Sequence, residues 1–189
     1  WDDYKAFVAP NLGANERWVP YHTAFGVHEF FLIDSVHHRK APGWDEKKRF
    51  VSMFVFRAHC KRDLFTEVEL PFLLDDSFWV NPVDSFKPGG VVERAILQYR
   101  RKTRRPLLTL CFRMIPRRVL EDDDENLVRS ITTRTQKLLV VAEKLWPVVK
   151  DQDSNSSQKF ARISAIVQSA DGLGETWAKM LMVCIDLAY

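Results

Sequence analysis

The sequence predicts an all-α fold, built as a single helical domain of about seven or eight helices. Apolar residues recur at helical spacing along most of the chain, and 189 residues fit one domain. The composition is 46% apolar and 28% charged, which excludes a disordered or fibrous chain. Only seven glycines are present, which argues against a glycine-rich nucleotide loop and a turn-dense β-sandwich.

The first predicted helix covers residues 23–40, after an irregular segment over 1–21. Its apolar positions recur at steps of three to five, and Thr23 fits the capping position before its first turn. Pro42 and Gly43 then end the helix, because both residues break helical patterns.

The second predicted helix runs from Asp45 to about residue 62 and is expected at the centre of the fold. Its run FVSMFVF (50–56) is apolar on nearly every side, as in a helix that other elements surround. A buried strand is the alternative interpretation of this run. The charged sequences on both sides extend the pattern to 18 residues, which is too long for one strand and favours the helix.

Two further helices are predicted on either side of a loop that is rich in proline and glycine. The first covers residues 64–75, and the second covers 91–101, where apolar positions gather on one side. The loop between them contains Pro82, Pro88, Gly89 and Gly90.

The second half of the chain is predicted to contain the longest helix. Pro106 fits the first position of a preceding helix over 107–115, where its missing N–H is no loss. The acidic run EDDDE (121–125) then starts a long helix that ends near residue 150, and its carboxylates suit the positive end of the helix dipole. The remaining predicted elements are a loop over 151–158 and helices over about 159–169 and 175–188.

The most specific local pattern is ADGLGETWAKML, in which Gly172, Leu173, Gly174 and Ala178 match Gly-apolar-Gly-x-x-x-Ala. With apolar helices on both sides, over 159–188, this is the pattern of a helix-hairpin-helix DNA-binding element. Two glycines let the backbone turn tightly and approach a phosphate, and free N–H groups of the next helix then face the anion. The plainer alternative is a glycine cap between two packed helices, which needs no ligand.

The segment that follows the hairpin contains two more candidate functional residues. Lys179 adds a positive charge for a phosphate, and Asp186 stands in the apolar run MLMVCIDLAY, 12 residues after Gly174. A carboxylate on a mostly buried helix is unfavourable unless it is paired or used, so Asp186 is a candidate catalytic residue. Alternatively, Asp186 lies on the exposed side of a terminal helix.

A strongly basic stretch over 92–118 contrasts with the formal net charge of +3 for the whole chain. It holds nine Lys and Arg residues and a single carboxylate, that of Glu93. Such a stretch can contact the DNA backbone, with Arg101, Arg104 and Arg105 as the candidate phosphate contacts. The alternative is a solvated face whose arginines pair with the acidic run just downstream.

The cysteine and histidine patterns predict neither a metal nor a cofactor. The three cysteines form no CxxC pair, which supports neither a zinc knuckle nor a disulfide framework, and the odd number fits a reducing compartment. His37 and His38 are adjacent and face about 100° apart on a helix, so they do not readily bind one metal. Arg57, at the edge of the apolar helix, fits either a buried anion site or a structural ion pair.

The block EFFLIDSVHHRKAPGWDEKKRFVSMFVFRAHCKRDLF (29–65) resembles the N-terminal motif of the alpha-glutamyl/putrescinyl thymine pyrophosphorylases. In that motif a helix ends in a basic residue, a Trp-Thr-Asp-like turn follows, and an apolar helix closes on an arginine. Arg39, Asp45 and Arg57 stand in these places, although the turn lacks its threonine. The closing GLGETWAKMLMVCIDLAY resembles the glycine hairpin of the same family with its downstream Asp-Leu.

The resemblance implies a helix-hairpin-helix DNA glycosylase-like fold and an enzyme that acts on a hypermodified thymine in DNA. Such an enzyme replaces a pyrophosphate on the methyl carbon of thymine with an amine, after the base has flipped out of the duplex. By the same resemblance, Arg39 and Arg57 would hold the pyrophosphate, and Asp45 or Asp186 would be the base for the amine.

Three functions remain open from the sequence: a base-modifying transferase or glycosylase, a non-catalytic helical DNA-binding module, and a helical protein-interaction domain. A DNA partner predicts a nuclear protein in a eukaryote and a cytoplasmic one otherwise. No run of 18 apolar residues is present, so no membrane span is predicted. A first residue other than Met indicates a fragment of a longer chain.

Overall fold

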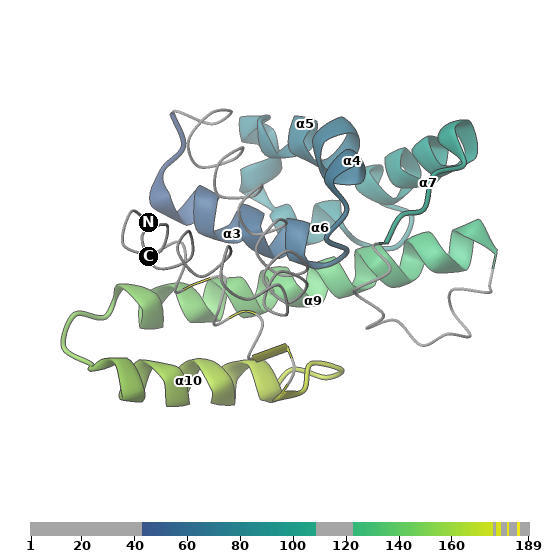
Figure 1. The fold of residues 1–189 in the computed structure, drawn as a ribbon. Helices are drawn as coiled ribbons and strands as arrows, with labels where there is room; N and C mark the ends of the chain where they lie inside the picture. Colours follow the sequence, from purple (N-terminus) through teal and green to yellow (C-terminus); the bar gives the residue numbers. More distant parts are fainter. Residues whose placement is uncertain (1–42, 109–122, 176, 179–180, 182–184, 186–189) are drawn as a thin grey trace, which may run out of the picture.

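The computed structural model describes residues 43–108 and 123–175, together with residues 177, 178, 181 and 185. Every regular element in these residues is helical and none is a strand, which confirms the all-α class (Figure 1). None of the described helices is both long enough and apolar enough to cross a membrane. The helix predicted over 23–40 lies outside the described residues.

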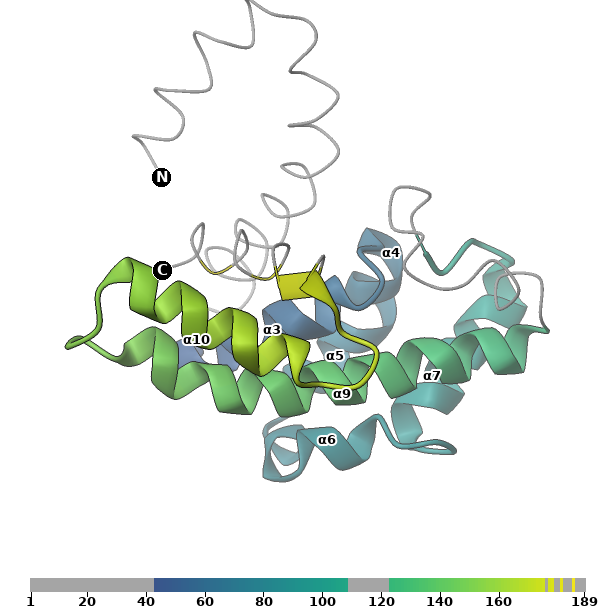
Figure 2. The same cartoon turned by 90° about the horizontal axis from the view of Figure 1, so that it is seen from below.

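The longest helix, α9 (Asp124–Lys150), lies at the centre of the arrangement. Figure 1 shows α10 (Ser156–Gln168) along one side of it and α3 (Glu46–Arg57) along the other. Seen from below, α9 and α10 run side by side (Figure 2). Another helix, α7 (Val91–Thr103), also packs against α9, whose apolar face is therefore buried along most of its length.

The sequence of α3 forms a helix and not a strand. The side chain of Asp45 caps it by accepting a hydrogen bond of 2.7 Å from the backbone N–H of Lys48. Every residue from Phe50 to Arg57 is buried, as expected of a helix that is apolar on nearly every side. The helix ends earlier than predicted because Cys60 adopts a left-handed conformation, with φ 53°, that turns the chain.

The single helix predicted over 64–75 is replaced by three consecutive helical parts. These are α4 (Arg62–Leu64), the π-helical turn η2 (Phe65–Glu69) and α5 (Leu70–Leu73). Pro71 accounts for the irregularity, because it has no N–H to donate to the carbonyl four residues earlier.

The prediction of a loop after this segment is wrong for part of the loop's length. It contains a 3₁₀-helix, η3 (Asp76–Val80), and a short α-helix, α6 (Pro82–Ser85). The side chains of Asp75 and Asn81 stabilise these turns by accepting hydrogen bonds from backbone N–H groups. Side-chain caps of this kind let short helical turns form within a sequence rich in proline and aspartate.

The helix predicted to start at Pro106 does not start there. Helix α7 closes at Arg104, which has φ 57° and donates its N–H to the carbonyl of Arg100 at 2.9 Å. Leu107 and Leu108 follow as a bend, and Leu107 is buried in the core. Burial of this leucine holds the chain in an irregular conformation; residues 109–115 of the predicted helix lie outside the described part.

Two of the three helices predicted from the acidic run onwards, the long helix and the one that follows it, are confirmed. Helix α9 begins where Asp123 accepts a hydrogen bond of 2.8 Å from the N–H of Asn126. Helix α10 begins at Ser156, earlier than predicted, because a capping box forms before it. The side chains of Asn155 and Gln158 each accept a hydrogen bond from the other residue's backbone N–H, at 2.9 and 3.0 Å.

Candidate nucleic-acid interface

The glycine hairpin joins α10 to a final helix, of which residues 175, 177, 178, 181 and 185 are described. Gly172 has φ +78°, a left-handed conformation that the turn requires and that glycine adopts without strain. Leu173 and Ala178 are both buried in the core between the helices. This geometry fits both a phosphate-binding hairpin and a plain glycine cap between two packed helices.

Gly174 leaves the start of the final helix open to an approaching group. Its carbonyl accepts the first helical hydrogen bond, at 3.2 Å from the N–H of Ala178, so Gly174 is the residue that caps this helix. Apart from its neighbours in the chain, a Cβ atom at Gly174 would meet no atom of the described residues within 4 Å. An anion can therefore approach the bare backbone at the positive end of the helix dipole.

Helix α9 places two cations beside the hairpin. The Nζ of Lys137 donates to the Oδ2 of Asp171 at 2.7 Å and to the carbonyl oxygen of Asp171 at 3.1 Å. This hydrogen bond, together with the lysine charge, lowers the pKa of the Asp171 carboxyl. The guanidinium of Arg134 lies 5.7 Å from the ring centre of Trp177 in a cation–π contact, and burial lowers the pKa of Arg134.

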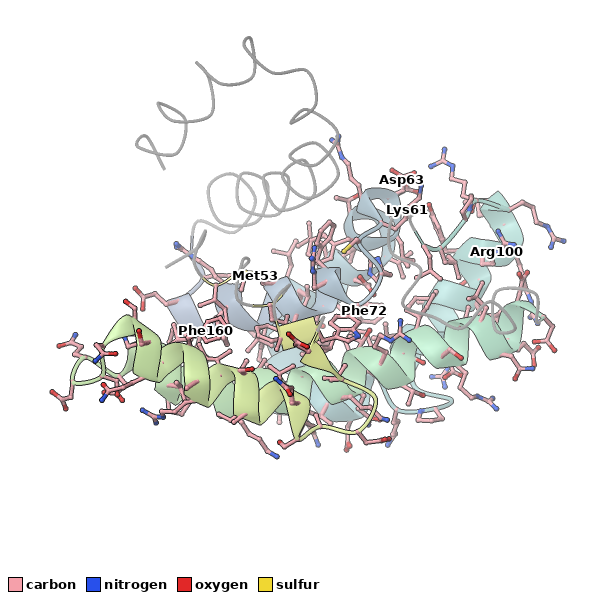
Figure 3. The ribbon with its side chains drawn as sticks, turned by 60° about the horizontal axis from the view of Figure 1, so that its bottom comes forward. Met53, Lys61, Asp63, Phe72, Arg100 and Phe160 are labelled. Atoms are coloured by element: carbon pink, nitrogen blue, oxygen red, sulfur yellow. The ribbon has the colours of Figure 1, made fainter. Side chains whose placement is uncertain are left out.

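Four arginines of the basic stretch, Arg100, Arg101, Arg104 and Arg105, pair with carboxylates in the described part of the chain. Figure 3 labels Arg100 near the start of α9, where its Nε donates to Oδ1 of Asp124 at 2.8 Å. This hydrogen bond is the main cause that lowers the pKa of Asp124. Arg101 donates to Glu125 at 2.7 Å, so residues of the acidic run neutralise the end of α7.

The other two candidate phosphate contacts in this stretch are also paired. Arg104 lies 3.7 Å from Asp124, and Arg105 lies 3.2 Å from Glu67. These pairs fit the alternative of a solvated, internally neutralised face. The side chains of Arg101, Arg104 and Arg105 nevertheless remain 54–76% exposed, and such surface pairs exchange partners readily.

The predicted catalytic residues within the described chain do not lie together. Asp45 caps the start of α3 and Arg57 is its last residue. At 1.5 Å per residue the two backbones are about 18 Å apart, too far to serve one base together. Asp45 therefore acts as a helix cap and not as the base of a site at Arg57. Arg39, Lys179 and Asp186 lie outside the described residues.

The end of α3 belongs to a buried polar cluster of which the sequence pattern predicts only one member, Arg57. This side chain is 1% exposed, and its Nη1 lies 3.6 Å from the Sγ of Cys60. His59 and Glu69 are also buried and contact each other. Glu69 stands in the apolar run VELPFLL. A carboxylate in such a run needs a partner, so the sequence itself indicates a buried polar contact at Glu69.

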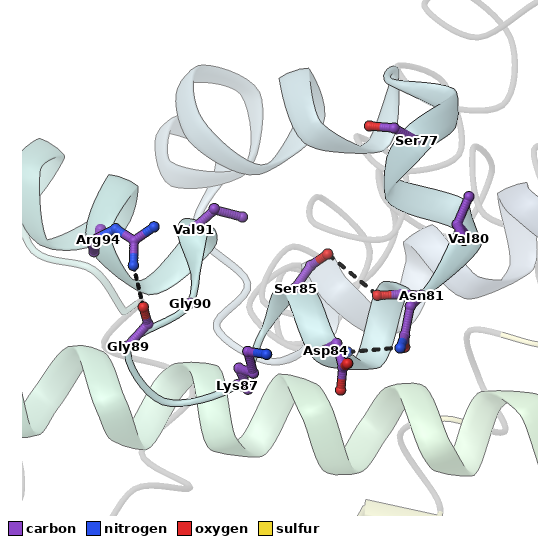
Figure 4. A pocket seen from close by; sticks show the side chains of 10 residues that line it. All are labelled: Ser77, Val80, Asn81, Asp84, Ser85, Lys87, Gly89, Gly90, Val91 and Arg94. Carbon is purple, nitrogen blue, oxygen red and sulfur yellow. Dashed lines mark hydrogen bonds between the residues drawn. The ribbon is translucent and has the colours of Figure 1, made fainter.

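A surface hollow of about 410 Å³ lies beside the start of α7 (Figure 4). Lys87, Asp84 and Arg94 bring charges of both signs to it, and Arg94 donates a hydrogen bond to the carbonyl of Gly89. Val80 forms part of its wall and is almost fully exposed. The hollow is open to solvent and has no concentration of one charge.

The described residues contain no group of three or more His, Cys, Asp or Glu side chains suited to a metal ion. Comparisons with protein-family models, with curated proteins and with solved structures found no match.

Proposed function

We propose that this chain is a helical DNA-binding protein that binds the phosphate backbone with its glycine hairpin and acts on a modified, thymine-type base. The observation that supports DNA binding is the hairpin itself. It combines the left-handed Gly172, the buried Leu173 and a Gly174 whose Cβ position would meet no atom of the described residues within 4 Å. These are the features that an anion site at a helix start needs.

The two glycines of the hairpin have different reasons to be glycine. The positive φ of Gly172 is sufficient reason for glycine at that position, with or without a ligand. Gly174 is not left-handed, and its surroundings leave room for a side chain. Ser, Asp and Asn are better than glycine at a capping position, so packing and capping do not explain Gly174. Close approach of a phosphate to the backbone does explain it.

The test compares Gly174→Asp with Gly174→Asn, using fluorescence anisotropy of a labelled DNA duplex over a series of salt concentrations. Both residues are good helix caps and differ by one charge, so both variants should fold. We expect the Asp variant to bind about tenfold more weakly than the Asn variant at low salt, with a smaller difference at high salt. Equal binding by the two variants, or wild-type binding that ignores salt, would contradict the proposal.

The proposed chemistry on the base comes from the family resemblance, which assigns Arg57 to the pyrophosphate. The C–O bond between the methyl carbon and the pyrophosphate breaks, a C–N bond forms, and the amine loses a proton. A guanidinium suits this step because it can hold two oxygens of the departing pyrophosphate at once. Arg57→Lys keeps the charge and removes this paired geometry.

Activity is measured as pyrophosphate released from a duplex that carries the pyrophosphorylated thymine, in the presence of a primary amine. We expect Arg57→Lys to slow this release and to leave the Kd for the duplex unchanged. Absence of release by wild-type protein that still binds the duplex would favour the second candidate, a non-catalytic DNA-binding module. The near-complete burial of Arg57, in contact with Cys60, is the observation that favours this second candidate.

A further inference from the structure

We propose that Lys137 is a DNA-phosphate contact that Asp171 occupies in the free protein, so that a phosphate at the hairpin displaces Asp171 from the lysine. This inference rests on the proposed DNA binding and adds a regulatory contact to the same site. Lys137 comes from the middle of α9 and not from the hairpin, so the hairpin sequence does not contain it.

The position of Lys137 carries the inference. Its Nζ is 3.8 Å from the place that a Cβ of Gly172 would occupy, so the ammonium lies directly beside the bare backbone of the turn. An ammonium has three hydrogen-bond donors, and Asp171 takes two of them through its carboxylate and its carbonyl. A phosphate at the hairpin therefore arrives within reach of a cation that already binds an oxyanion.

The exchange of Asp171 for a phosphate is favourable because the existing pair is weakly held. The side chain of Asp171 is 93% exposed and that of Lys137 is 41% exposed. Ion pairs exposed to this extent contribute little to stability, because water screens both charges. A phosphate diester offers Lys137 an anionic oxygen within a polyanion, and its binding also releases counterions from the DNA.

Arg134 is the neighbouring cation and has a different role. It lies one turn before Lys137 on α9, but its guanidinium stacks on Trp177 and burial lowers its pKa. This contact fixes the side chain against the final helix. Lys137 is therefore the cation of this pair that can change partner.

Three variants test the inference in the same anisotropy assay. Lys137→Gln should weaken duplex binding about fivefold and reduce the slope of log Kd against log salt by about one. Asp171→Asn should strengthen binding about threefold, because it leaves Lys137 available and removes a repulsive charge. Lys144→Gln is the matched control, since it removes the same charge from an exposed position on α9 and should leave the slope unchanged.

The double variant separates displacement from simple repulsion. If Asp171 acts by occupying the lysine, then Asp171→Asn should give a smaller gain when Lys137 is already Gln. An equal gain in both backgrounds, or an unchanged salt slope for Lys137→Gln, overturns the inference. Either result together with the expected loss for Gly174→Asp leaves the proposed DNA binding intact, whereas wild-type protein that binds no duplex overturns both.

Discussion

The Nε2 of His59 lies 2.5 Å from the Oε2 of Glu69, and both side chains are completely buried. The backbone N–H of Lys61 donates to the other ring nitrogen, Nδ1, at 3.0 Å. Since Nδ1 must accept, Nε2 carries the hydrogen and donates it to Glu69. The bond joins the turn after α3 to the π-helical turn η2, and it lies two residues from Arg57.

The first prediction concerns this buried bond. Glu69→Gln keeps an oxygen that can accept from His59, whereas Glu69→Leu leaves the buried Nε2–H without an acceptor. We expect the Leu variant to lose about 1–3 kcal/mol of unfolding free energy and the Gln variant to lose less. Urea denaturation measures both values. A Leu variant as stable as wild type would show that the bond adds nothing.

The second prediction concerns the contact between α3 and α9. The ring of Phe50 lies 5.0 Å from that of Phe54 and 5.2 Å from that of Trp146, measured between centroids. Phe50→Ala should therefore lower the unfolding free energy by about 3–5 kcal/mol. Phe160→Ala is the matched control, because Phe160 on α10 is 49% exposed (Figure 3), and it should lose far less. Equal losses would contradict the assignment of Phe50 to the core.

The sequence predicts the helices well and their ends less well. Helices α3 and α9 follow from long apolar patterns that only a helix satisfies over that length. The start and end points of the helical segments depend on the local effects of single residues. Pro71 removes one backbone donor, Cys60 turns the chain through a left-handed conformation, and Asn155 starts α10 early. Such effects depend on the local backbone geometry and are not visible in the hydrophobic pattern.

The sequence likewise predicts some features of the candidate site and not others. The hairpin is predictable because its four defining positions lie within one short segment, where spacing determines geometry. The pairs of Arg100 and Arg101 with the acidic run are predictable as an alternative, because the two runs are close in the sequence. Distant pairs are not predictable, because packing determines the partners: Arg105 meets Glu67, 38 residues earlier, and Lys137 meets Asp171, 34 residues later. The basic stretch therefore suggests a larger free charge than the folded chain presents.

The third prediction uses the loop before α7. A Cβ at Gly90 would lie 2.7 Å from the carbonyl oxygen of Lys87 and 2.9 Å from that of Ser85. Because both neighbours are backbone atoms, neither can move aside without distorting the turn. Gly90→Ala should lower the unfolding free energy by about 1–3 kcal/mol. Gly43→Ala is the control and should leave the urea midpoint nearly unchanged, because a Cβ there meets no atom of the described residues within 4 Å.

The last prediction is a pH dependence at the loop between α9 and α10. Hydrogen bonds from Ser154 and Arg162 lower the pKa of Asp151 from 3.8 to about 2. A carboxyl whose pKa is lower in the folded chain stabilises it fully above its unfolded value, and this contribution disappears as the pH falls towards about 2.

Asp151→Asn has no carboxyl to titrate, so the stability gap between wild type and this variant should shrink as the pH falls from about 5 to about 2. Urea midpoints at several pH values measure the gap. Ser154→Ala removes the largest cause of the lowered pKa, so in that background the total change of the gap should be smaller and should be complete at a higher pH. A gap that stays constant across this range would mean that the bonds to Asp151 do not differ between the folded and unfolded chain.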